Sequence, residues 1–159
     1  MRKLVTFASA FAMTFAFGAN AFANSPDIYV VNFRSDKNAE SQKLDRELSA
    51  ALSMVGNAEH VVIDTSNAAK WEKSAHEAFD RDIVPVFNKW VGLPGFAAIV
   101  DARSKRVMGC VNGGFSSVEI ANEIRKMSAQ SNNRAYLSKA STSSKSTNCP
   151  DRYNEDPGF

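Results

Sequence analysis

Cys110 and Cys149 are the only cysteines among the 159 residues, and they are the first candidates for chemistry. In an oxidising compartment, an even number of cysteines predicts a structural disulfide. A bond between them would close a loop of about 40 residues and stabilise the fold by on the order of 3 to 4 kcal/mol. The alternative is that Cys110 is a free reactive thiol or that Cys149 is linked to a partner. Nothing in the local sequence places a helix N-terminus beside Cys110 to favour its thiolate.

The remaining candidates for chemistry are histidines and aspartates, and they are scattered. His60 and His76 have no cysteine or carboxylate at a zinc-binding spacing, so we expect a strand-edge residue and a solvated helix residue. Asp27, Asp64 and Asp101 stand at the ends of predicted strands, with no base or nucleophile paired to them. Turn and capping roles suit these carboxylates better than acid–base catalysis. The sequence therefore predicts no metal and no cofactor.

The N-terminus has the pattern of a secretory signal peptide. Arg2 and Lys3 precede an apolar stretch over residues 4–17, and small residues follow at Ala21 and Ala23. An apolar run of about 14 residues is shorter than the roughly 20 that cross a bilayer, which disfavours an uncleaved anchor. We expect a signal peptide over residues 1–23, cut after Ala23.

Export changes the meaning of the net charge of +2. Arg2 and Lys3 are the only charged residues of the signal, so its removal reduces the 19 cations to 17, the number of anions. A neutral chain without a Lys/Arg run does not suit a nucleic-acid partner. No second hydrophobic stretch reaches membrane-spanning length. We therefore expect a periplasmic protein with no nucleic-acid partner and no integral membrane segment after cleavage.

Hydrophobic periodicity predicts an α/β domain over residues 24–128. Apolar runs predict strands, whereas apolar residues at helical spacing predict amphipathic helices. The expected strands cover residues 27–33, 60–64, 96–100 and 106–112. The first expected helix covers residues 37–55, and the second follows the possible caps at 65–67. A short helix is expected from Pro85, and the last helix follows a capping box at 116–119. The order is βαβαββα, in which alternating units run parallel and a closing hairpin makes the sheet mixed.

Two further features concern the surface of this domain. Four aromatic residues have the spacing of core residues: Trp71, Phe79, Phe87 and Trp90. Only an exposed pair among them would indicate a binding surface. Beyond Met127 the composition changes to Ser, Thr, Asn and Lys, which cannot bury enough apolar surface to fold alone. We expect a polar, mobile tail over residues 129–159, whose end a Cys149 bond would hold to the sheet.

One local motif resembles the thioredoxin-like superfamily. Trp90-Val91-Gly92-Leu93-Pro94 leads directly into the predicted strand 96–100, as the family's helix, short loop, cis-proline and strand do. Gly113-Gly114 before the last helix is similar to the family's glycine after the hairpin. The resemblance covers residues 27–127. It implies a thioredoxin-like fold with a mixed central sheet and helices on both faces.

The family's dithiol activity is not carried over by this resemblance. Thioredoxin-like oxidoreductases carry Cys-x-x-Cys just after the first strand, where a helix N-terminus lowers the pKa of a thiol. The corresponding segment here, residues 34–41, contains no cysteine, and Asn38 and Ser41 occupy the cysteine spacing. Neither side chain can exchange disulfides. We therefore predict a domain that is more plausibly a non-enzyme than an oxidoreductase.

Binding of a protein partner is the function that the resemblance leaves. Thioredoxin-like proteins bind extended polypeptide against the backbone before the cis-proline, which needs no cysteine. The expected partner site comprises Gly92, Leu93, Pro94 and Gly95 together with Asn38 and Ser41. An accessory or chaperone-like component of an envelope, secretion or conjugation assembly fits these features. The alternative is a thiol-disulfide oxidoreductase or redox-responsive protein that uses Cys110, Cys149 or both.

Overall fold

The computed structural model describes residues 25–132 and 149–151. The expected signal peptide, its cut after Ala23 and most of the expected polar tail lie outside the described residues. Within them, no helix is long and apolar enough to cross a membrane.

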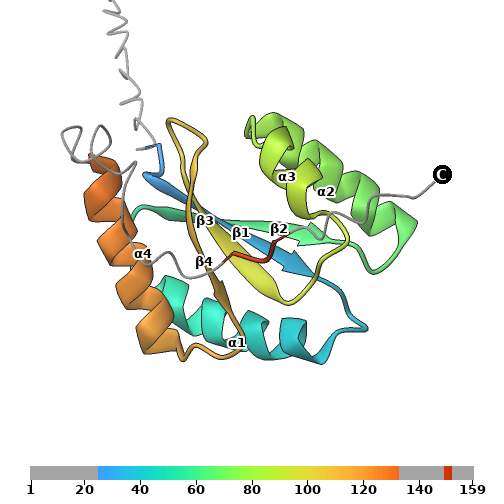
Figure 1. The fold of residues 1–159 in the computed structure, drawn as a ribbon, viewed down its shortest axis with the longest axis horizontal. Helices are drawn as coiled ribbons and strands as arrows, with labels where there is room; N and C mark the ends of the chain where they lie inside the picture. The colour runs from blue at the N-terminus through green and yellow to red at the C-terminus, as the bar shows by residue number, and fades with distance from the viewer. Residues whose placement is uncertain (1–24, 133–148, 152–159) are drawn as a thin grey trace, which may run out of the picture.

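The described residues form a four-stranded mixed sheet with four helices (Figure 1). The strands are β1 (Ile28–Arg34), β2 (Ala58–Asp64), β3 (Phe96–Asp101) and β4 (Val107–Asn112). The helices are α1 (Ala39–Ser53), α2 (Ala68–Asp80), α3 (Val84–Trp90) and α4 (Ser117–Asn132). The α/β class and the predicted order of elements are thereby confirmed.

The strand order is β2-β1-β3-β4, so β1 and β3 are central and β2 and β4 are the outer strands. β1 runs parallel to β2 and antiparallel to β3, and β3 runs antiparallel to β4. Parallel β1 and β2 are connected through α1, as a crossover requires, whereas the short connection after β3 closes an antiparallel hairpin. The register of that hairpin shifts between Ile99 and Val100.

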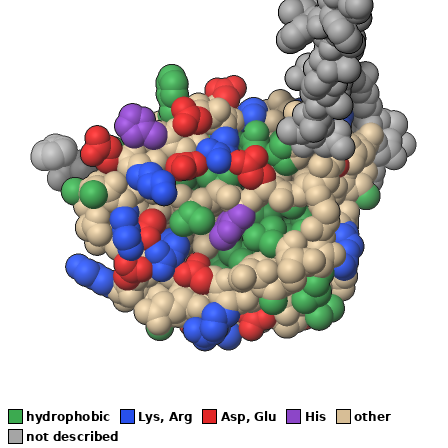
Figure 2. All heavy atoms as spheres, turned by 180° about the vertical axis from the view of Figure 1, so that it is seen from behind, with side chains coloured by type: hydrophobic (Ala, Val, Ile, Leu, Met, Phe, Trp, Pro, Cys, Tyr) green, Lys and Arg blue, Asp and Glu red, His purple; other side chains and the backbone are tan. Residues whose placement is uncertain are grey.

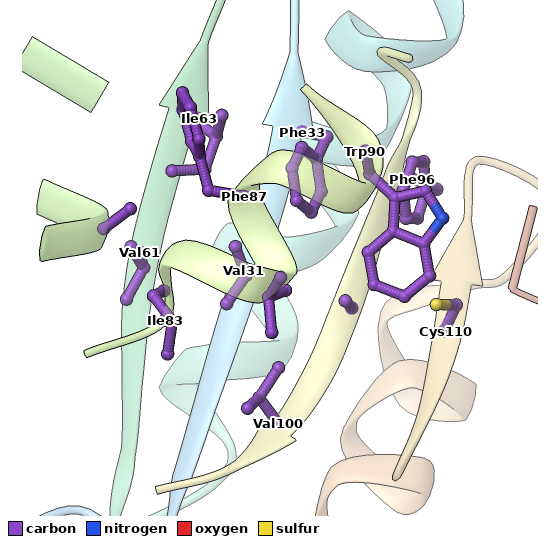
Figure 3. Packing of buried hydrophobic residues seen from close by; sticks show 13 residues of the cluster. Val31, Phe33, Val61, Ile63, Ile83, Phe87, Trp90, Phe96, Val100 and Cys110 are labelled. Atoms are coloured by element: carbon purple, nitrogen blue, oxygen red, sulfur yellow. The ribbon is translucent and has the colours of Figure 1, made fainter. Parts of the chain in front are cut away.

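Each face of the sheet is covered by two helices and holds its own apolar core. α1 and α4 pack on one face, against residues such as Ile28, Val30 and Ile99. α2 and α3 pack on the other, where Trp90 lies between Phe96 and Cys110 (Figure 3). The central strands are therefore buried on both sides, which explains why their sequences are almost unbroken apolar runs.

The helix ends follow the capping chemistry in the sequence. The side chains of Asn38 and Asn67 accept backbone hydrogen bonds at the starts of α1 and α2. The predicted capping box before α4 is present, since Ser116 N–H donates to Glu119 Oε2 at 2.8 Å. Pro85 stands in the first turn of α3, where its missing N–H costs nothing.

α4 extends past the point where the composition changes, to Asn132. Its last turn is polar but held, because Ser131 is buried and donates a hydrogen bond to Asp101. The Asn132 side chain donates to Asp27 at 2.9 Å. Polar side chains at two strand ends thus anchor four helical residues that the sequence assigned to the tail.

The prediction of four core aromatics is wrong for two of them. Phe87 and Trp90 are buried, but Trp71 is 47% exposed and Phe79 is 74% exposed. Both lie on α2, and the Trp71 ring contacts the Phe87 ring of α3 edge to face, with 5.9 Å between the ring centroids. Helical spacing placed them on the same stripe as buried Ala78, but the short α3 covers only part of that stripe.

Candidate functional site

Asn38 and Ser41, which the sequence predicts as part of the candidate site, both form hydrogen bonds at the start of α1. The Asn38 side-chain oxygen accepts a hydrogen bond from the Ser41 N–H at 2.8 Å. Ser41 is fully buried, and its hydroxyl oxygen accepts from the Ser35 N–H at 3.2 Å. Both side chains therefore hold the turn between β1 and α1 in place. At this position, Asn38 and Ser41 act as hydrogen-bonding groups.

The loop before β3 lies directly against this helix start. Gly95 has a backbone φ of 105°, a conformation that favours glycine. Its N–H donates to the Phe33 carbonyl at 2.8 Å, which ties the loop to the end of β1. A side chain at Gly95 would come within 3.3 Å of the Asn38 side-chain oxygen. The structure therefore brings together Gly95 and Asn38, which the sequence placed in one site.

Leu93 and Pro94 depart from the pattern that the resemblance implied. No peptide bond among the described residues is cis, so the bond before Pro94 is trans. The Leu93 N–H donates to the Trp90 carbonyl at 3.0 Å and so is already bonded within the loop. The Leu93 side chain is 38% exposed, and Gly92 beside it is exposed too. This loop presents an apolar side chain, while the amide that strand addition would use is occupied.

A third loop, after β4, meets the same helix start. Gly113 is buried, and a Cβ there would lie 3.4 Å from the Glu40 carbonyl oxygen and 2.5 Å from its carboxylate. Only a residue without a side chain fits this approach unless Glu40 moves. Three loops thus converge on the first turn of α1, at the end of the sheet where the central strand β1 ends.

The two cysteines form a disulfide, as predicted. Cys110 of β4 and Cys149 are bonded, with Cα atoms 4.9 Å apart and a sequence separation of 39. The Trp90 indole N–H donates to the Pro150 carbonyl at 2.9 Å. The segment around Cys149 is therefore held at two points, one covalent on β4 and one polar at the end of α3.

A network of charges at the ends of β1 and β2 is the main feature that the sequence did not reveal. Arg34 contacts three carboxylates: Asp64, Asp36 at 2.7 Å and Asp45 at 3.0 Å. Lys70 contacts Asp36 and also Asp64, the latter at 3.2 Å. These residues are spread from position 34 to position 70. The parallel pairing of β1 with β2 places Arg34 beside Asp64, while α1 supplies Asp45 and α2 supplies Lys70.

Electrostatics in this network favour the ionised carboxylates. Hydrogen bonds from Lys70 and then Arg34 lower the pKa of Asp36 to about 2. Burial opposes ionisation of Asp64, but its bonds to Ser66, Lys70 and Arg34 outweigh that effect, so its pKa is also lowered. Asp36 and Asp64 are therefore ionised at neutral pH.

Asn32 and His60 lie on the same face as this network. Asn32 is fully buried and donates to Asp45 at 2.7 Å, while its side-chain oxygen has no hydrogen-bond partner among the described residues. His60 pairs with Val30 and lies on β2 two residues before Val62, the register partner of Asn32. Burial lowers the pKa of His60, and the charge of Asp45 opposes that shift. The imidazole is therefore neutral at neutral pH.

Comparisons of the chain with protein-family models, with curated proteins and with solved structures found no match.

The aspartates and histidines take the structural roles that the sequence predicted. Asp27 accepts from Asn57 at 2.6 Å, and Asp101 accepts from the Ser104 N–H at 2.6 Å, so both hold connections at strand ends. His60 lies on an outer strand and His76 is exposed on α2. Within residues 25–132 and 149–151, no three His, Cys, Asp or Glu side chains are grouped to hold a metal ion.

Proposed function

We propose that the chain is an exported, thioredoxin-like domain that binds a protein partner at the three loops around the first turn of α1. The strand order and directions support this assignment, because a parallel β1–β2 pair followed by an antiparallel β3–β4 hairpin is what the resemblance implies. The helices on both faces agree with it as well. The trans bond before Pro94 is a departure from that family pattern.

The observation that carries the proposal is a hydrogen-bonded helix start with an exposed apolar side chain on the loop beside it. Asn38 and Ser41 are hydrogen-bonded to each other at the cysteine spacing, and Gly95 packs against Asn38. Leu93 stands exposed on the neighbouring loop. A site of this kind can bind a partner surface through Leu93 without forming a mixed disulfide.

Export is supported by the disulfide. Such bonds persist in oxidising compartments, and the bond between Cys110 and Cys149 joins a strand of the core to a distant segment. Together with the N-terminal pattern of residues 1–23, it favours a periplasmic location and a role as an accessory or chaperone-like component of an envelope, secretion or conjugation assembly. The oxidoreductase alternative would require this bond to open, although Cys110 is only 3% exposed.

A photo-crosslinking amino acid placed at Leu93 in the full-length protein tests the site in living cells. The matched control carries the same group at Val118, which is 56% exposed and lies in the first turn of α4. We expect a discrete crosslinked adduct from position 93 and none from position 118, together with loss of the Leu93 adduct when Gly95 is changed to Val. Equal adducts from both positions, or none from Leu93 in the envelope fraction, would show that the three loops are the wrong site.

A further inference from the structure

Among the described residues, β2 has an open strand edge, because it pairs with β1 on one side and with no strand on the other. On its other side, the Asp64 N–H donates to the Ser74 hydroxyl oxygen at 2.8 Å, while the next residue, Thr65, donates back to the Arg34 carbonyl at 3.1 Å. The backbone groups of a strand alternate between its two edges. His60 and Val62 therefore turn their N–H and C=O groups to the same outer side as Asp64.

β2 lacks three of the features that commonly block further pairing at an outer strand, which are a proline, a lysine and a bulge. α2 lies beside this edge. Residues 58–64 contain no proline and no lysine, and their register with β1 is unbroken. Among the described residues, only Ser74 forms a side-chain hydrogen bond with the outer edge of β2, at Asp64.

A groove runs along this edge, between β2 and α2. It has a volume of about 400 Å³. Its strand side is formed by His60, Val62 and Asp64, and its helix side by Lys70, Lys73, Ser74, Glu77 and Arg81. Val62 is 37% exposed at its floor. Figure 2 shows a face of this composition, with charged side chains of both signs around hydrophobic side chains and a histidine.

The charges lining the groove leave one cation uncompensated. Asp64 is paired with Arg34 and Lys70, and Glu77 is paired with Arg81. Arg81 has Glu59 as a second partner, at 2.6 Å.

Lys73 is the exception. It is exposed, it lines the groove, and it forms no ion pair with any described residue. A ligand that completes the groove would therefore bring an anionic group to Lys73 and an apolar group to Val62.

We infer that the outer edge of β2 binds an extended segment of a partner protein as an added strand. The main chain of that segment would pair with the outward N–H and C=O groups of His60 and Val62. Its side chains alternate along the groove, so that an apolar residue lies over Val62 and a glutamate or aspartate meets Lys73. This surface is separate from the loops around α1, so an experiment can disprove binding at one of the two sites without disproving it at the other.

The test uses a synthetic peptide, acetyl-Thr-Val-Glu-Val-Thr-amide, and the mature protein labelled for NMR. We expect saturable shifts of the His60 and Val62 amide signals and about tenfold slower hydrogen exchange of those amides. The same peptide with N-methyl groups on the amides that face β2 should not bind, since it cannot donate the ladder hydrogen bonds. A peptide with Lys in place of Glu should bind more weakly.

Two variants locate the binding on the protein. Val62→Pro removes an N–H that faces away from β1, a position where an outer strand tolerates proline. Lys73→Glu should weaken binding of the Glu peptide about twofold to fivefold and strengthen binding of the Lys peptide, within the range of exposed ion pairs. Lys43→Glu, on an exposed part of α1 without an ion pair to a described residue, is the matched control and should change neither.

Three results would overturn the inference. One is equal binding of the N-methylated peptide, which would mean that no strand is added. Another is a set of shifts centred on Leu93 rather than on β2. The third is self-association of the free protein in sedimentation experiments that Val62→Pro abolishes, because the edge would then belong to a second copy of this chain. If Val62→Pro fails to fold by circular dichroism, the N-methylated peptide still decides between these outcomes.

Discussion

At the β4 side of the sheet the chain returns and packs against the strand, whereas at the β2 side the described chain leaves the strand edge open. Cys149 is bonded to Cys110 of β4, and Pro150 accepts a hydrogen bond from Trp90. On β2, the corresponding contact is a single serine, Ser74. A covalent bond on one side can thus stabilise a small domain whose other side has few contacts along the strand edge.

The largest expected effect comes from removing the staple on the β4 side. Replacing both cysteines, Cys110→Ala with Cys149→Ser, should lower the free energy of unfolding by on the order of 3 to 4 kcal/mol, because the unfolded chain regains the entropy of the closed loop. Urea unfolding of the two proteins, with and without reductant, measures it. Reductant should lower the free energy of unfolding of the native protein to that of the variant, and it should leave the value for the variant unchanged. A native protein insensitive to strong reductant would mean that the bond adds little.

The next prediction separates the contribution of the Trp90–Pro150 hydrogen bond from that of the disulfide. Trp90 is fully buried, and Trp90→Phe removes both its bond to Pro150 and part of its packing. We expect a loss of about 2 kcal/mol. In the variant without cysteines the loss should be smaller by about 1 kcal/mol, because Pro150 is then no longer held near the indole. Equal losses in the two backgrounds would show that the two contacts act independently.

A smaller effect is expected on the β2 side. Ser74 is 2% exposed and satisfies the outward N–H of Asp64. Ser74→Ala should cost about 1 kcal/mol in stability, since that N–H would be left in a partly buried position without its partner. Hydrogen exchange of the Asp64 amide should accelerate at the same time. Ser53→Ala, whose hydroxyl is exposed and bonds to the Ala50 carbonyl, is the control and should change stability by less than about 0.5 kcal/mol.

The β4 side was largely predictable from the sequence because local patterns dictate it. An even number of cysteines, a hairpin and a capping box are all readable from spacing. The outer position of β2 was not readable in this way, and neither was the partial cover of α2. Trp71 and Phe79 fit the helical stripe of a core helix, but α3 is too short to bury them. Burial of that stripe depends on the length of a neighbouring element, which periodicity does not encode.

The candidate site also has features that could be predicted from the sequence and features that could not. Asn38 and Gly95 were correctly placed together, because the resemblance supplies a spatial neighbourhood as well as a motif. The trans bond before Pro94 and the occupied amide of Leu93 are local conformational outcomes that residue types do not determine. The Arg34 network was missed for another reason. Its members are ordinary charged residues, and their proximity follows from the pairing of β1 with β2 and from the positions of α1 and α2.

The smallest expected effect concerns that network, which closes the end of β2 where the open edge begins. The pKa of Asp36 is lowered to about 2 by Lys70 and Arg34, so the unfolded chain takes up a proton first as the pH falls. The stabilisation from Asp36 is therefore complete above about pH 5 and lost as the pH approaches about 2. Asp36→Asn should lower the urea midpoint slightly at neutral pH and flatten its decline in acid.

Asp80→Asn provides the control, because Asp80 is exposed on α2 and forms no ion pair with any described residue. Its urea midpoint should follow that of the native protein at every pH. If Asp36→Asn also follows the native protein, the exposed pair of Asp36 with Lys70 contributes nothing measurable, as is common for surface ion pairs. The end of β2 would then be held mainly by the contacts of Asp64 with Arg34, Lys70 and Ser74, and the contrast with the disulfide on the β4 side would be larger still.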